Sequence, residues 1–177
     1  MKLLLYCTKG KELWGDGTGE TWNDIAEDED LDLVFELNPT LTRLNGKIVA
    51  QCDCEKVDNI IYNGWWNCYA NSEEINYDTF FDETNTCLTQ EQISKYLKND
   101  VGYALHLCNL EVFDNPKKLS DFGVKTAPRN MVKCFDDKGN EYALISTRPE
   151  HLKYFLNGEK TIEVRKKVLK ELEELTK

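Results

Sequence analysis

The sequence of 177 residues lacks several features that assign a protein to a class at once. It has no apolar run long enough to cross a membrane. The apolar residues 3–5 are too few for a secretory signal, and no processing site follows them. Internal repeats and low-complexity linkers are also absent. We therefore expect one cytoplasmic domain over residues 1–177 that makes no contact with a membrane.

Metal-binding and nucleophilic signatures are missing as well. The seven cysteines lack the spacing of zinc ligands. Cys52 and Cys54 alternate with polar residues and share a strand face with Ile48 and Ala50, which is typical of small buried side chains in a reducing compartment. We expect no disulfide, no metal and no cofactor.

Positive charge is scarce. The chain has 22 Lys or Arg against 32 Asp or Glu, a net charge of −10. Residues 1–100 hold 8 basic and 20 acidic residues, whereas residues 101–177 hold 14 basic and 12 acidic residues. A broad basic face for a long duplex is therefore excluded. A small cationic pocket could still hold one nucleotide.

Short patterns predict a mixture of strands and helices. Strands are expected at 2–8, 47–57, 101–112 and 142–146. Helices are expected at 89–98, where Thr89 and Gln92 form a capping box, at 116–122 and after Arg165. Residues 9–42 read as a long acidic loop, and residues 58–89 have little periodicity. The aromatic residues at 62, 65, 66 and 69 either stack unpaired bases or anchor a loop.

Residues 143–165 are the most informative. An apolar strand leads to a helix with Pro149 at its first position, and Gly158 sits where a left-handed cap is needed. In the following strand, alternation predicts that Ile162 and Val164 face the core, with Glu163 and Arg165 on the other side.

This pattern resembles the ASCH family of the PUA-like superfamily, whose signature is a Pro-Glu helix start followed by Gly-x-Lys-x-x-Glu-x-Arg. The matching residues are Gly158, Lys160, Glu163 and Arg165. Segments 3–9, 45–50, 102–107 and 127–130 also resemble later parts of the family. The resemblance implies an α+β fold: a PUA-like β-barrel with flanking helices.

The family places the signature first, whereas here it comes last. The resemblance therefore implies a circular permutation, in which segment 143–177 completes the barrel begun by residues 1–134. Two alternatives remain: a truncated second copy, or a segment exchanged between two chains of a swapped dimer. The chain is accordingly expected to be a monomer or a swapped dimer.

From spacing alone, the charged residues of this segment could form a surface ion-pair ladder. The resemblance instead implies that Lys160, Glu163 and Arg165 line a groove for RNA or a nucleotide. Arg148 and Lys9 would flank it, or be ordinary exposed charges. His106 and His151 have no recognisable Cys or Ser partner, which gives a nucleophilic triad little support.

Two further functions remain open. Some ASCH proteins resemble hydrolases of acylated cytidine. In such an enzyme Lys160 would be the nucleophile or base activator and Glu163 the acid–base, but Glu163 stands where those proteins have Thr. The chain also looks like compact phage-type proteins, whose acidic surface could inhibit a basic host nuclease.

Overall fold

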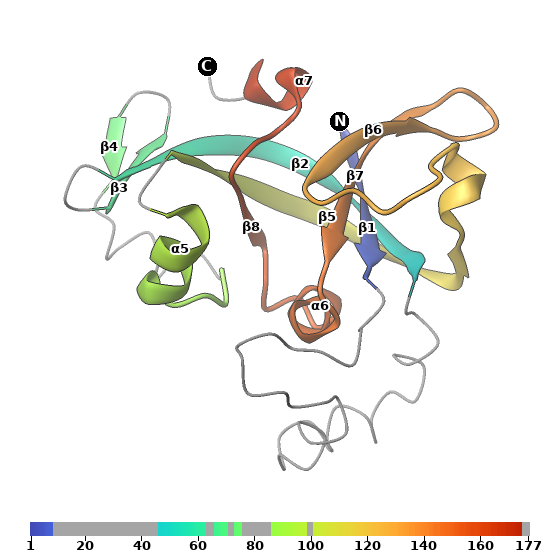
Figure 1. Cartoon of the computed structure of the whole chain (residues 1–177), viewed down its shortest axis with the longest axis horizontal. Helices are drawn as coiled ribbons and strands as arrows, with labels where there is room; N and C mark the ends of the chain where they lie inside the picture. Colours follow the sequence, from blue (N-terminus) through green and yellow to red (C-terminus); the bar gives the residue numbers. More distant parts are fainter. Residues whose placement is uncertain (9–45, 63–65, 71–72, 76–85, 99–100, 175–177) are drawn as a thin grey trace, which may run out of the picture.

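The computed structural model describes residues 1–8, 46–62, 66–70, 73–75, 86–98 and 101–174 (Figure 1). The strands are β1 (Lys2–Cys7), β2 (Lys47–Tyr62), β3 (Trp66–Ala70), β4 (Glu73–Ile75), β5 (Gly102–Lys117), β6 (Met131–Phe135), β7 (Glu141–Thr147) and β8 (Ile162–Arg165). The helices are α5 (Gln90–Leu97), α6 (Pro149–Leu156), α7 (Lys170–Glu173) and the short 3₁₀ helix η1 (Leu119–Phe122).

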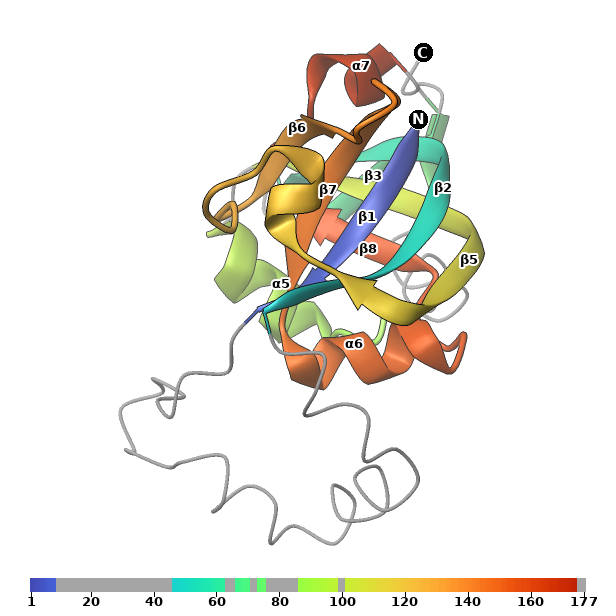
Figure 2. The same cartoon turned by 90° about the vertical axis from the view of Figure 1, so that its right-hand side faces the viewer.

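The strands form one mixed, eight-stranded sheet. Six of them follow the order β6-β7-β1-β2-β5-β8 and curl into a half-barrel (Figure 2), and β3 and β4 extend the end of β2. The pair β1–β7 is parallel, and the other described pairs are antiparallel. Helix α6 lies across one end of the half-barrel (Figure 1, Figure 2). The expected α+β class and barrel-like sheet are therefore present.

Apolar clusters cover both faces of the curled sheet. The main cluster lies inside the half-barrel, because strands from all around the curl and helices α6 and α7 contribute to it. A second cluster packs the outer face of β5 and β8 against Ile93 and Leu97 of α5, and a third packs β1 and β7 against Phe122 of η1. The main cluster comprises Leu3, Leu5, Cys7, Val49, Ala50, Cys52, Cys54, Val57, Leu105, Ala143, Ile145, Leu152, Phe155 and Leu172.

A seam between β8 and the β6–β7 hairpin is bridged by side chains. Among the described strands β8 pairs with β5, and β7 pairs with β1 and β6. Asn130, before β6, donates through Nδ2 to the carbonyl oxygen of Lys167 at 2.7 Å. Lys133 of β6 forms an ion pair of 2.8 Å with Glu171 of α7. Strand pairing places both β7 and β8 in the same sheet as β1, β7 directly beside it and β8 through β5 and β2.

Several predicted elements are confirmed. Helix α5 begins after Thr89 with the expected capping box, and α6 has Pro149 in its first turn. The strand at 2–8, the strand at 142–146 and the left-handed Gly158 are present within a residue or so of their predicted positions. Local signals fixed these elements, because caps and turn residues act within a few positions.

Other expectations were wrong. Strand β2 continues to Tyr62 and β3 and β4 follow, where little regular structure was expected. Residues 116–117 end strand β5, so the helix expected at 116–122 shrinks to η1. Ile48 lies in the third cluster rather than with Ala50, because a register shift opposite Leu5 and Tyr6 changes the face of the strand. The loop at 9–42 and the aromatic side chains at 62, 65, 66 and 69 lie outside the described residues.

We predict that Thr89→Ala destabilises the protein by about 1 kcal/mol. Thr89 Oγ1 accepts from the backbone N–H of Gln92 at 3.2 Å, and the Gln92 side chain accepts from the N–H of Thr89 at 2.9 Å. Removing the hydroxyl leaves a helix-terminal donor without its cap. Urea unfolding measures the change, with the exposed Thr126→Ala as the control. Equal losses in the two variants would contradict the prediction.

Candidate functional site

The turn between α6 and β8 positions Lys160. Gly158 has a φ of 78°, a left-handed conformation that glycine adopts without steric strain. The N–H of Lys160 donates to the carbonyl oxygen of Tyr154 at 2.7 Å, and the N–H of Leu107 donates to that of Thr161 at 2.8 Å. These bonds tie the turn to α6 on one side and to β5 on the other, so Lys160 enters the site from a fixed backbone.

Strand β8 turns its charged side chains inward. Glu163 is opposite Leu105 in the antiparallel pair with β5, and opposed residues share a face of the sheet. Leu105 belongs to the main cluster inside the half-barrel, whereas Ile162 and Val164 pack on the α5 side. The expected alternation is confirmed. The expectation that Glu163 and Arg165 point away from the core is wrong, because they are 8% and 6% exposed.

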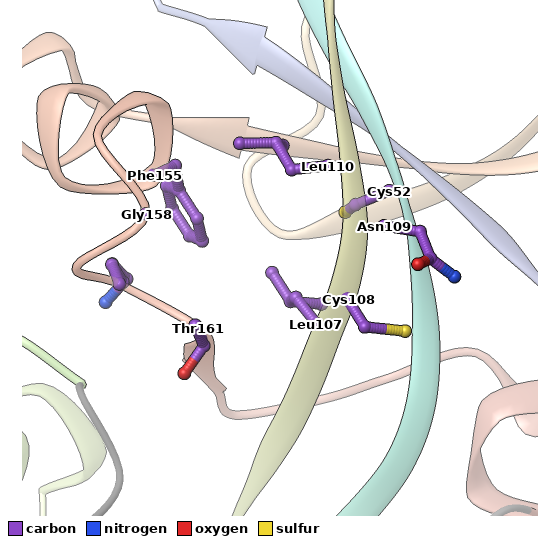
Figure 3. Close-up of a pocket in the computed structure, with 9 residues that line it drawn as sticks. Cys52, Leu107, Cys108, Asn109, Leu110, Phe155, Gly158 and Thr161 are labelled. Carbon is purple, nitrogen blue, oxygen red and sulfur yellow. The ribbon is translucent and has the colours of Figure 1, made fainter.

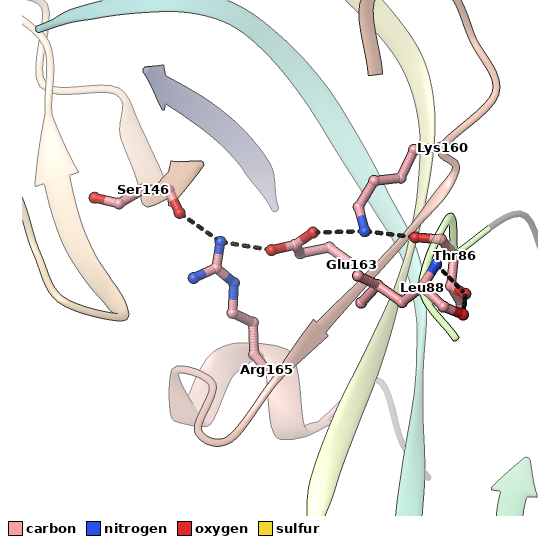
Figure 4. Close-up of polar contacts among 6 residues, drawn as sticks. All are labelled: Thr86, Leu88, Ser146, Lys160, Glu163 and Arg165. Carbon is pink, nitrogen blue, oxygen red and sulfur yellow. Dashed lines mark hydrogen bonds and ion pairs between the residues drawn. The ribbon is translucent and has the colours of Figure 1, made fainter. Parts of the chain in front are cut away.

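The three motif side chains form a continuous polar chain (Figure 4). Lys160 Nζ donates to the carbonyl oxygen of Thr86 at 2.7 Å and lies 3.3 Å from Glu163 Oε2. Arg165 Nη2 lies 2.6 Å from Glu163 Oε1 and donates to the carbonyl oxygen of Ser146 at 2.7 Å. The polar chain of these three side chains therefore connects the segment before α5 with strand β7. Sequence reasoning missed Thr86 and Ser146, because backbone acceptors carry no side-chain signal.

The polar chain has a net charge of one positive unit, since two cations flank one carboxylate. Burial would raise the pKa of Glu163, but the charges of Arg165 and Lys160 outweigh burial and hold that pKa below its ordinary value. Glu163 is therefore a carboxylate at neutral pH. A surface ion-pair ladder does not describe this arrangement, because Lys160 is only 4% exposed.

Two polar atoms in and near the polar chain have no hydrogen-bond partner among the described residues. Arg165 Nε and Thr147 Oγ1 are buried, and neither has a hydrogen-bond partner within the described part of the chain. Thr147 is two residues beyond Ile145 in β7 and therefore shares its face of the strand, the inner face of the half-barrel that Arg165 also faces. Buried polar groups of this kind are normally satisfied by protein, water or ligand. Arg165 Nε and Thr147 Oγ1 thus lack, among the described residues, the partner that buried polar atoms normally have.

His151, in the first turn of α6, lies in the same electrostatic environment. Burial, together with the positive charges of Lys160, Arg148 and Arg165, lowers the pKa of His151 to about 4, although the charge of Glu163 opposes the shift. The imidazole is therefore neutral at physiological pH.

Of the two residues expected to flank the groove, Arg148 and Lys9, the structure describes only Arg148. Arg148 is exposed at the N-cap of α6, and its charge acts on His151. It therefore lies near the polar chain without entering it. Lys9 lies outside the described residues, so its expected place beside the groove stays a prediction.

A separate polar cluster lies on β2 and β5. The buried Asp58 accepts from His106 Nε2 at 2.7 Å and pairs with Lys56 at 2.9 Å. Burial would raise the pKa of Asp58, but the hydrogen bonds from His106 and Lys56 hold it below its ordinary value. His106 is half-buried, and its partner is a carboxylate from the neighbouring strand.

A small pocket opens beside Lys160, on the inner side of β2 and β5 (Figure 3). It has a volume of about 150 Å³. Strands β2 and β5, helix α6 and the turn before β8 form its walls. The lining residues are Cys52, Leu107, Cys108, Asn109, Leu110, Phe155, Gly158, Lys160 and Thr161.

The described ranges contain neither a cluster of metal ligands nor a membrane-spanning helix. No group of three or more His, Cys, Asp or Glu residues there could hold a metal ion. None of the helices in those ranges is long and apolar enough to span a membrane.

We predict that Glu163→Gln destabilises the protein by about 3–5 kcal/mol. The substitution keeps the volume of the side chain but leaves Lys160 and Arg165 as buried cations without a counter-charge. Arg165→Ala should destabilise the protein to a similar extent, because it leaves Glu163 with one buried counter-charge fewer. Chemical unfolding tests both, with the exposed Glu159→Gln as the matched control. A loss of stability no larger than that of Glu159→Gln would contradict the inward placement of the polar chain.

We also predict that the folded state loses stability as the pH falls from 7 to 5. The unfolded chain protonates His151 near its ordinary pKa of 6.5, whereas folded His151 resists protonation down to about 4. This difference contributes a loss of about 2 kcal/mol over that interval. Glu163 acts in the same direction only at lower pH. Urea unfolding at pH 7 and pH 5 measures this loss of stability, which should be smaller in His151→Gln than in the wild-type protein. An equal loss in the two proteins would exclude His151 as its source.

Comparison of the chain with protein-family models, with curated proteins and with solved structures gives no match. The ASCH assignment therefore rests on the motif and stays a prediction.

Proposed function

We propose that this chain is a circularly permuted ASCH/PUA-like module that binds a nucleotide or a similarly small anionic ligand at the Lys160–Glu163–Arg165 chain. The observation that carries the proposal is Arg165 Nε, a buried cationic donor without a partner among the described residues. A charge-assisted hydrogen bond from such a donor is stronger than a neutral one. An anionic group would satisfy it and offset the net positive charge of the polar chain.

The permuted topology is supported by strand neighbours. Joining the end of β8 to β1 restores the family's order of segments, and β1 lies beside β7 in the sheet. The helix and turn between β7 and β8 hold the signature lysine, as the resemblance implies.

A small ligand fits the site better than a long RNA strand. Side chains that track a strand are exposed along a basic groove. Lys160, Glu163 and Arg165 are each under 10% exposed, and the whole chain carries a net charge of −10. An enclosed donor such as Arg165 Nε suits one phosphate or carboxylate group rather than a polymer. RNA binding would then be limited to a single terminal or flipped nucleotide.

The enzyme alternative has weaker support. Lys160 Nζ is engaged by the Thr86 carbonyl and by Glu163, which are the contacts of an ammonium group rather than of an attacking amine. Glu163, paired with two cations, is poorly suited to carry a proton. We expect no turnover of acylated cytidine by the wild-type protein. The alternative of an acidic inhibitor rests on composition, and its acidic run at 27–30 lies outside the described residues.

The binding test uses Thr147→Val, which removes the buried hydroxyl with little change in shape. Because Thr147 Oγ1 has no partner among the described residues, we expect the fold to be as stable as wild type or slightly more so. Calorimetric titration with uridine monophosphate, adenosine monophosphate and inorganic phosphate should show a several-fold loss of affinity in the variant.

Arg165→Lys keeps the charge and removes Nε with the planar fork, so it should weaken binding as well. The exposed Thr126→Val serves as the control and should bind as wild type does. Absence of binding by the wild-type protein to all three compounds would overturn the proposed function. Binding that is equal in all four proteins would remove Thr147 and Arg165 from the site.

A further inference from the structure

The pocket beside Lys160 owes its shape to an irregularity in β5. Gln51 is opposite Glu111 and Asp53 is opposite Cys108, so Asn109 and Leu110 together face the single residue between Gln51 and Asp53. This is the pattern of a β-bulge, which bends a strand and redirects its side chains.

Asn109 sits in the bulge with a φ of 51°, a left-handed conformation that is uncommon for residues other than glycine. Its Nδ2 donates to Asp53 Oδ2 at 3.1 Å, which ties the bulge to β2. The bulge therefore holds the rim of the pocket in place. Residues in such conformations cluster at ligand sites.

The walls of the pocket are mostly apolar, and Lys160 is the charged residue among the lining residues. Leu107, Leu110 and Phe155 supply carbon surface (Figure 3). Burial raises the pKa of Cys52 to about 12, with smaller contributions from nearby charges, and burial also raises the pKa of Cys108, so both sulfurs are neutral thiols at physiological pH. The ammonium of Lys160 is engaged by the carbonyl oxygen of Thr86 and by Glu163.

The dimensions select the size of an occupant. The volume of about 150 Å³ equals that of an engineered apolar cavity known to bind benzene. A single six-membered ring fits such a space, whereas a fused two-ring system exceeds it. A flat ring also suits walls of leucine, phenylalanine and sulfur, because sulfur and aromatic carbon make favourable contacts with an aromatic face or edge.

We propose that this pocket binds a single unsaturated ring, and that the ring belongs to the ligand whose anionic group contacts the polar chain. The second half of this statement rests on the proposed function. Lys160 joins the two parts, because it lines the pocket and begins the polar chain. Both parts lie on the inner face of the half-barrel, since Phe155 and Cys52 of the pocket belong to the same apolar cluster as Leu105, which lies opposite Glu163. The site should therefore prefer one-ring over two-ring compounds.

Cys108 provides a direct reporter of occupancy. It is half-buried at the pocket, and Cys87 is similarly half-buried but does not line it. Benzene, a neutral one-ring probe, should slow the alkylation of Cys108 by iodoacetamide several-fold and leave that of Cys87 unchanged, as measured by peptide mass spectrometry. Naphthalene, at the same free concentration, should protect much less.

A pair of variants on β5 tests the location. Leu110→Trp fills the mouth of the pocket and should abolish the protection of Cys108 by benzene. Val112→Trp is the matched control, because Val112 is two residues along the same strand, is also exposed and does not line the pocket. Its protection should match wild type. Loss of protection in both variants, or in neither, would overturn the assignment of the ring to this pocket.

Protection of Cys108 by nucleotides tests the ring site and the proposed function separately. Uridine monophosphate should protect Cys108, and adenosine monophosphate should protect it less. Tight nucleotide binding without protection of Cys108 would overturn the ring site and leave the anion site standing. Protection by benzene without any nucleotide binding would keep the pocket and overturn the proposed function together with the link between ring and anion. Failure of every probe to protect Cys108 would overturn the ring site.

Discussion

Glu163 lies between two cations inside an apolar half-barrel, and this arrangement constrains the strands around it. Each partner also bonds to a backbone carbonyl from a distant segment, Lys160 to Thr86 and Arg165 to Ser146. The polar chain thereby joins β8 to β7 across the seam, where the described strands are not paired by backbone hydrogen bonds. A buried charge without its partner is strongly unfavourable, so the position of β8 is tied to its neighbours.

The same residues consequently serve the fold and the proposed site. Sites of this kind depart from the rule that apolar residues fill a core, and such departures concentrate where proteins bind ligands. The Lys160–Glu163–Arg165 cluster carries a net positive charge, although the protein as a whole is acidic. Attraction of an anion would therefore act at short range, after the ligand has reached the half-barrel, rather than through a long-range field. Salt in the medium would weaken such a buried contact less than a surface contact.

How much the sequence could predict depended on the range of each signal. Thr89 with Gln92 and Pro149 with Gly158 are local signals, and the helices and turns that they predict are present. The alternation of β8 was also readable, but alternation alone cannot tell which face is enclosed. Apolar clusters cover both sides of β8, so its charged face was wrongly assigned to the outside. The bulge at Asn109 arises from pairing between strands about 55 positions apart, as the bond to Asp53 illustrates, and left no pattern to read.

The parallel pairing of β1 with β7 has a consequence for how the chain reaches its fold. Lys2 pairs with Tyr142 and Cys7 with Thr147, so this contact joins segments separated by about 140 residues. Contacts of such high sequence separation slow folding, because a long loop must close before they form. During synthesis, β1 would emerge from the ribosome long before its neighbour β7 exists. Its five consecutive buried residues, Leu3 to Cys7, would stay exposed to chaperones or to other nascent chains until the last strands arrive.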